Sequence, residues 1–152
     1  MSFMFRYHFR LIWLMLRYLW QGKPVAHESR LTYRASASDC DLFGHINNGR
    51  YLEFFDFGRM DLFLRTGFWR HARNEGVLPM VAAQSVRYLK EVRWGQKFEV
   101  ETTFDRLDGK AMVLRGKILI NGDLVTETEC TLLAVQRGKV IDPTPLLPFF
   151  KT

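Results

Sequence analysis

The spacing of apolar residues changes several times along this chain. Residues 3–20 and 50–66 are rich in apolar side chains at three-to-four-residue spacing and contain no proline, a pattern typical of helices. The other regular segments alternate apolar and polar positions, as half-buried strands do. These segments are residues 28–37, 80–92, 97–107, 110–120 and 123–136. The pattern predicts an N-terminal helix, a strand, a long helix and then four antiparallel strands.

Two dipeptides mark tight turns between the last three strands. Asp108-Gly109 and Asn121-Gly122 each separate two alternating runs, and such pairs are the strongest short-range signals of a β-hairpin. Their turns need a positive φ, which glycine adopts without strain. The helix at 50–66 is apolar over most of its circumference, so we expect it to be enclosed on several sides. The predicted fold class is α+β, with one antiparallel sheet wrapped around one long central helix.

The N-terminal helix, Phe3 to Trp20, is predicted to be amphipathic. It contains seven of the 22 aromatic residues, and Arg6, Arg10 and Arg17 fall within an arc of about 40° when residues are placed at 100° intervals. In one interpretation it lies in a membrane interface with its arginines toward anionic headgroups. In a second, its apolar face packs on the domain's own sheet or on a partner subunit. A spanning helix or a signal peptide is disfavoured, because two arginines inside the hydrocarbon would cost a few kcal/mol each.

Charge and composition divide the chain into an N-terminal segment, a central domain and a C-terminal tail. The formal charge is +6 over 152 residues, and residues 1–24 carry +4 of it. The remainder is nearly balanced, which argues against nucleic-acid binding. Gly22 and Pro24 mark a linker, so we expect residues 1–24 to form the helix and linker and 25–142 one domain. Residues 143–152 are expected to form an extended tail because they contain Pro143, Pro145 and Pro148.

Several common catalytic motifs are absent from the sequence. There is no G-x-S-x-G elbow, no phosphate loop, no C-x-x-C pair and no H-E-x-x-H. Polar residues instead gather from Asp39 to Asn48, directly before the apolar helix. Asn47 or Asn48 can cap that helix, whose free N–H groups could bind a developing oxyanion. Asp39 or Asp41 could act there as general base or nucleophile toward an acyl group, and an ordinary capping turn is the alternative.

A longer motif gives this turn a family resemblance. The pattern D-x-D-x-x-G-H-I-N-N-x-x-Y runs from Asp39 to Tyr51, and Phe54-Phe55-Asp56 and Arg59 follow it. It resembles the signature of hotdog-fold acyl-CoA thioesterases of the 4-hydroxybenzoyl-CoA thioesterase type, as do Tyr88-Leu89-Lys90 and Trp94-Gly95 further on. The chain is also similar to thioesterase superfamily member 6 proteins, which likewise carry a hydrophobic N-terminal segment. The resemblance covers roughly residues 28–142 and implies a hotdog fold that dimerises edge to edge, with active sites at the subunit interface.

The resemblance also implies roles for individual residues. Asp41 occupies the position of the catalytic carboxylate, and the backbone N–H of Asn48 matches the amide that polarises the thioester carbonyl. His45 lies in the same catalytic motif, and its side chain is expected to hold the turn together with those of Asn47 and Asn48. Four substrate-binding positions are expected: Asn47 in the same motif, an aromatic near the pocket and two cations for the CoA phosphates. The aromatic is Tyr51, and the cations are Arg106 and Lys110.

The sequence thus predicts an acyl-CoA thioesterase that hydrolyses a thioester without metal or cofactor. Related enzymes place a catalytic acid on the central helix instead, where Glu53 or Asp56 is the nearest candidate. A homodimer or tetramer is expected, in the cytoplasm, with peripheral membrane contact through the N-terminal helix. The alternative function is a non-catalytic acyl- or lipid-binding protein that uses the same pocket.

Overall fold

The computed structural model describes residues 3–20 and 26–151. Its helices are α1 (Phe3–Trp20), α2 (Asn48–Arg65) and α3 (Phe68–Glu75), with 3-10 helices η1 (Ala37–Asp39) and η2 (Thr144–Phe149). Its strands are β1 (Glu28–Arg34), β2 (Val77–Tyr88), β3 (Lys97–Asp108), β4 (Ala111–Ile120), β5 (Asp123–Gln136) and β6 (Lys139–Val140). The linker predicted around Gly22 and Pro24 lies outside the described residues.

The strands form one antiparallel sheet in the order β1-β3-β4-β5-β2, with β6 added to β5. Both predicted hairpins are confirmed, one joining β3 to β4 and the other β4 to β5. Asn121 and Gly122 have φ values of 53° and 88°, as a two-residue hairpin turn requires. Strands β1 and β2 form the two edges of the sheet.

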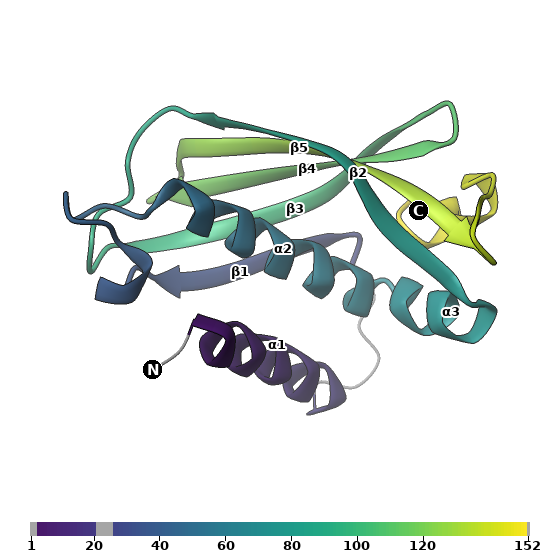
Figure 1. Cartoon of the computed structure of the whole chain (residues 1–152), viewed down its shortest axis with the longest axis horizontal. Coiled ribbons are helices and arrows are strands. Elements are labelled where there is room, and N and C mark those ends of the chain that lie inside the picture. The colour runs from purple at the N-terminus through teal and green to yellow at the C-terminus, as the bar shows by residue number, and fades with distance from the viewer. Residues whose placement is uncertain (1–2, 21–25, 152) are drawn as a thin grey trace.

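Helix α2 lies across the sheet, which curls around it (Figure 1). Phe54, Phe57 and Leu62 are fully buried, which confirms the enclosed helix. The sheet approaches α2 closely at Gly116 of β4, where an added Cβ would lie 2.6 Å from a methyl carbon of Thr128 and 2.7 Å from the ring of Phe55. Glycine therefore allows a separation between helix and sheet that no larger residue would permit without rearrangement.

Helix α1 packs beside α2 through one of its faces (Figure 1). Leu14 is buried in the main core cluster, and the Tyr7 ring lies 5.1 Å from that of Phe57 between centroids. This face therefore packs on the domain itself, as the second interpretation expected, but mainly against α2 rather than against the sheet. The opposite face is apolar and more than half exposed at Phe9, Ile12, Trp13 and Leu16. None of the helices in the described residues is long and apolar enough to span a membrane.

Several parts of the fold differ from the sequence prediction. Strand β1 ends at Arg34 rather than at residue 37, because the chain coils into η1 from Ala37. Helix α3 was not predicted; it starts after Gly67 and ends before Gly76, both left-handed. Strand β2 begins at Val77 rather than at residue 80 and ends at Tyr88 rather than at 92. The prediction that residues 143–152 form an extended tail is wrong, because Thr144–Phe149 form the 3-10 helix η2. Proline's φ fits a helical first turn, and the buried side chains of Leu146 and Phe150 hold the segment in the core.

Candidate functional site

The segment between η1 and α2 folds back on itself. The N–H of Asn47 donates to the carbonyl of Asp39 (3.0 Å), and the N–H of Asp41 donates to the carbonyl of His45 (2.9 Å). Gly44 turns the chain between them with a φ of 80°, a conformation that favours glycine. Residues 40–46, named here the aspartate loop, therefore form a closed turn whose two ends meet at Asp39.

The aspartate loop is also tied to the segment that follows β2. The N–H of Ile46 donates to the carbonyl of Val92 (2.8 Å), and the N–H of Trp94 donates to that of Gly44 (2.9 Å). Ile46 and Val92 are buried in the core cluster. This attachment fixes the loop against the end of the sheet where α2 begins.

Asp41 holds a partly exposed carboxylate on this loop. Its side chain is 28% exposed; Oδ1 accepts the N–H of Phe43 (2.9 Å), and Oδ2 lies 3.4 Å from Nδ1 of His45. The other ring nitrogen of His45 lies 3.9 Å from a carboxylate oxygen of Glu91. His45 thus stands between two carboxylates, where it can orient Asp41 and leave part of that carboxylate open to a ligand.

Helix α2 begins beside the aspartate loop, two residues earlier than predicted. Asn47 is its cap: Oδ1 accepts the N–H of Gly49 (2.9 Å), and the carbonyl accepts the N–H of Arg50 (2.8 Å). The N–H of Asn48, next to the cap, meets no acceptor within the part of the chain described. It lies at the positive end of the helix dipole and is suited to bind a developing oxyanion.

Tyr51 and Tyr88 lie beside this helix start. Their rings meet edge to face, with 5.1 Å between centroids. The Tyr51 hydroxyl accepts the N–H of Val92 (3.1 Å), and the Tyr88 hydroxyl donates to the carbonyl of Asn48 (3.2 Å). Burial is the main cause that raises the pKa of Tyr51, so its phenol is neutral near pH 7. Tyr51, the predicted pocket aromatic, is therefore buried and packs against the start of the helix. Tyr88 contacts the same helix start, and no role was predicted for its side chain.

Large apolar side chains project around Asp41. Leu42 is fully exposed, Phe43 is 85% exposed and Trp94 is 68% exposed. The Phe43 ring stacks on that of His45 with centroids 6.0 Å apart. Exposed apolar groups clustered at a polar site indicate a contact surface. Sequence reasoning passed over them, although two apolar residues inside a turn rich in Asp and Asn are a visible signal.

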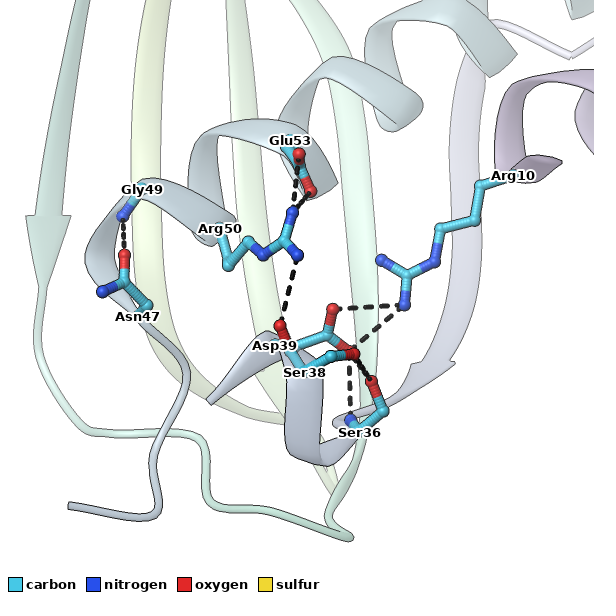
Figure 2. A network of polar contacts seen from close by, with 8 residues as sticks. All are labelled: Arg10, Ser36, Ser38, Asp39, Asn47, Gly49, Arg50 and Glu53. Atoms are coloured by element: carbon cyan, nitrogen blue, oxygen red, sulfur yellow. Dashed lines mark hydrogen bonds and ion pairs between the residues drawn. The ribbon is translucent and has the colours of Figure 1, made fainter. Parts of the chain in front are cut away.

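Asp39 has entirely different surroundings (Figure 2). Its side chain is 1% exposed; one oxygen accepts the N–H (3.0 Å) and the hydroxyl of Ser36, and both face Nη2 of Arg10 at 3.2 and 3.4 Å. Burial alone would raise the pKa of Asp39, but the hydrogen bonds of Ser36 and the charge of Arg10 outweigh it and lower the pKa. The sequence offered Asp39 and Asp41 as candidate catalytic carboxylates; Asp39 is buried, and both of its carboxylate oxygens already have hydrogen-bond partners.

The acids of α2 are also engaged in ion pairs. Both carboxylate oxygens of Glu53 accept Nη1 of Arg50, at 2.7 and 2.8 Å. Asp56 pairs with Arg59 at 2.7 Å and accepts the Tyr7 hydroxyl. In the described residues, no group of three or more His, Cys, Asp or Glu side chains could hold a metal ion.

Arg106 and Lys110 lie at the other end of the sheet. Arg106 is held between Asp105 and Glu129, and Lys110 is exposed in the β3–β4 turn. Strand β3 starts near the aspartate loop and runs 12 residues before it reaches that turn, roughly 40 Å at the rise of a strand. The chain does not bring its predicted phosphate-binding cations to its own Asp41.

An antiparallel sheet curled around one long helix, with a polar loop at the helix start, defines the hotdog class of proteins. The chain belongs to the thioesterase-like superfamily, whose family model matches residues 35–151. The predicted α+β hotdog fold is thereby confirmed, together with its N-terminal helix.

Individual proteins similar to this chain agree with that assignment. Protein THEM6 of Danio rerio is 30% identical over 119 residues, which cover 77% of this chain and 59% of the relative. Among solved structures, the probable thioesterase YbaW of Escherichia coli has a TM-score of 0.75 at 18% identity and covers 81% of this chain and 99% of its own. A 4-hydroxybenzoyl-CoA thioesterase mutant complexed with 4-hydroxybenzoyl-CoA has a TM-score of 0.72 at 15% identity, over 83% of this chain and all of its own. The chain spans between 43% and 59% of the length of the curated THEM6 relatives it matches.

Proposed function

We propose that this protein is an acyl-CoA thioesterase with Asp41 as its catalytic carboxylate. The observation that carries the proposal is the placement of a partly exposed carboxylate on a fixed loop beside a capped helix start, where the N–H of Asn48 has no acceptor among the described residues. The other candidate acids, Asp39, Glu53 and Asp56, are bound to arginines. The family membership and the CoA ester bound to one structural neighbour favour a CoA thioester as substrate.

This arrangement suits hydrolysis of a thioester. The thioester carbonyl oxygen accepts the N–H of Asn48, so that negative charge developing on it is stabilised by the helix end. Asp41 then either removes a proton from the water that attacks the carbonyl carbon or attacks that carbon itself. The C–S bond then breaks, and CoA leaves as a thiolate that takes up a proton. When water attacks, the free acid forms directly; when Asp41 attacks, the acyl group remains on its carboxylate as an anhydride, which a water molecule hydrolyses to the free acid. His45 holds the carboxylate in place during these steps.

A second copy of the chain would complete this site. Strand β2 has a free edge and exposes Leu78, Met80 and Val81, and long apolar edges pair readily with another chain. Two β2 strands related by a two-fold axis run antiparallel. The Tyr88 end of one copy, beside Asn48, would then lie next to the Val77 end of the other. That end adjoins the β3–β4 turn through β5, so Lys110 and Arg106 of the second copy would approach the aspartate loop. We propose a homodimer on these grounds, alone or within a tetramer.

Thiol release from acyl-CoA substrates tests the proposed activity. The full chain is incubated with acyl-CoAs of increasing chain length, together with an aromatic acyl-CoA, and free CoA is measured. Turnover that depends on the acyl group is expected, since apolar side chains surround Asp41. Saturable binding of the acyl-CoAs without any thiol release would instead support the alternative, a non-catalytic acyl-binding protein.

We also propose that α1 contacts a lipid surface through its outward face, which places the protein peripherally at a membrane. The exposed row of Phe9, Ile12, Trp13 and Leu16 is apolar. Aromatic and aliphatic side chains on one outward helix face suit the boundary between headgroups and acyl chains.

Flotation with vesicles containing anionic lipid tests this contact in the full chain. The double substitution Ile12→Ser/Leu16→Ser should abolish flotation, and Val140→Ser, at an exposed apolar residue on β6, should not change it. Deletion of the helix would be a poorer test, because Leu14 and Arg10 belong to the domain's interior contacts. Equal flotation of the double variant and the wild type would contradict the contact.

A further inference from the structure

We propose that Arg10 of α1 is a positioning residue for the aspartate loop, and so that the N-terminal helix is a structural part of the catalytic site. The expected effect of Arg10 on turnover rests on the proposed thioesterase function. The geometric part, that Arg10 holds the loop through Asp39, stands on contacts that join two segments 29 residues apart.

The Arg10 side chain is fixed on its way to Asp39. Its guanidinium carbon lies 5.0 Å from the centroid of the Phe54 ring and 5.7 Å from that of Tyr33. The side chain is only 20% exposed. Two aromatic rings from α2 and β1 thus hold a cation whose Nη2 reaches both oxygens of the Asp39 carboxylate. Figure 2 shows this side chain crossing from α1 to η1.

Asp39 transmits this contact to both ends of the aspartate loop. Its carboxylate binds Ser36 and thereby closes η1, from which the loop departs at Cys40. Its carbonyl accepts the N–H of Asn47, where the loop returns and α2 is capped. The side chain of Arg10 therefore fixes the one residue on which the two ends of the loop converge.

A second arginine secures the same region from α2. Arg50 donates to the carbonyl of Ser38 (3.2 Å) and is itself held by Glu53. Arg10 and Arg50 approach η1 from two helices, and η1 lies between them (Figure 2). Of the two, only Arg10 neutralises the buried carboxylate.

Loss of the Arg10 cation would leave Asp39 charged in a nearly water-free place. Such a group moves toward solvent, binds water or takes up a proton, because an unpaired buried charge is strongly unfavourable. Each response changes the hydrogen bonds by which Asp39 closes η1, and so displaces the loop that carries Asp41 relative to the N–H of Asn48. Catalysis depends on the relative position of these two groups, and displacements of about 1 Å can lower a rate by a factor on the order of 100.

The test compares Arg10→Met with Arg17→Met, its matched control on the same helix. Arg17 stacks on Trp13 and makes no contact with Asp39. Two quantities are measured for the full chain: kcat and KM for the best acyl-CoA, and amide hydrogen exchange of residues 41–47. Arg10→Met is expected to lower kcat by a factor of about 10 to 100 with little change in KM, and to speed exchange at the N–H groups of Asp41, Gly44 and Asn47. Arg17→Met should behave as wild type, and Arg10→Lys should restore most of kcat.

Several results would overturn the inference. Unchanged exchange and turnover in Arg10→Met would do so, and so would equal losses in Arg10→Met and Arg17→Met, which would indicate only a general effect of the helix. Arg10→Gln, which keeps hydrogen-bond donors, takes the place of Arg10→Met if that variant does not fold. If the wild type releases no thiol, the proposed function fails, and the exchange rates alone decide whether Arg10 holds the loop.

Discussion

Two aspartates separated by one residue have opposite surroundings in this protein. Asp39 is buried between Ser36 and Arg10, whereas Asp41 is partly exposed beside His45. The backbone produces this difference, because Asp39 ends η1 and Asp41 begins the turn. A buried structural carboxylate and the carboxylate that we propose to be catalytic therefore lie two positions apart in one short motif, each with its own hydrogen-bond partners.

The lowered pKa of Asp39 predicts a particular response to acid. A carboxyl group whose folded-state pKa is below its unfolded value, near 4, stabilises the fold above that value. The stabilisation is lost as pH falls through the folded-state pKa. Wild type should therefore lose more free energy of unfolding than Asp39→Asn between about pH 6 and about pH 2, as measured by urea unfolding. The exposed Asp108→Asn serves as control, and a wild type that loses no more than Asp39→Asn would contradict the assigned role of Asp39.

Sequence reasoning predicted the candidate catalytic turn but not the contacts that hold it. The spacing from Asp39 to Tyr51 pointed to the loop, and Asn47 does cap the helix. The Arg10–Asp39 contact joins residues 29 positions apart, which no local pattern encodes. In the membrane interpretation Arg10 was expected to face lipid headgroups, and instead it turns inward because a buried carboxylate lies within its reach.

Among the elements, β2 has the most exposed apolar edge. We predict that Val81→Lys yields a monomer, because a charge on each copy would be brought close to the two-fold axis of a β2–β2 dimer. Light scattering after size exclusion would give half the mass of wild type. Val140→Lys introduces the same charge at another exposed valine, on β6, and should leave the mass unchanged. A Val81→Lys variant that stays as large as wild type would rule out pairing through β2.

The contact between α2 and the sheet depends on a glycine of the helix. A Cβ at Gly58 would overlap the hydroxyl of the buried Thr102 and lie 3.3 Å from a methyl carbon of Val100. Gly58→Ala should reduce the free energy of unfolding by about 1–3 kcal/mol, measured by denaturant unfolding. Gly49→Ala in the same helix has only one contact, at 3.4 Å, and should not destabilise; equal effects of the two would show that the close approach is not the cause.

Elements set by local signals were predicted well, and those set by distant contacts were not. The hairpins depend on glycines at fixed positions in their own turns, so the sequence was sufficient. Helix η2 is held because Phe150 packs against Phe63, Phe68 and Phe104, residues far away in the chain. The prolines of the tail alone were equally compatible with an extended segment.

For the whole molecule, the positive charge of the N-terminal segment lies partly inside the domain and partly on its surface. Residues 1–24 carry +4 of the net +6, and at least one of these arginines, Arg10, is directed into the domain. Part of the positive charge of this segment is thus used inside the domain, where Arg10 holds η1 through Asp39. Helix α1 has one face in the core and one apolar face outside, so it joins the candidate catalytic loop to the surface that we propose meets lipid.

The most direct test of the account is the turnover of Asp41→Asn with acyl-CoA. The amide keeps the size of the side chain and its hydrogen bond from Phe43 but loses the charge that would activate water or attack the thioester. We predict that kcat falls by a factor on the order of 100 or more, with the mass in solution and the melting temperature unchanged and with full activity in the exposed control Asp123→Asn. Near-normal thiol release by a folded Asp41→Asn variant would contradict the central claim.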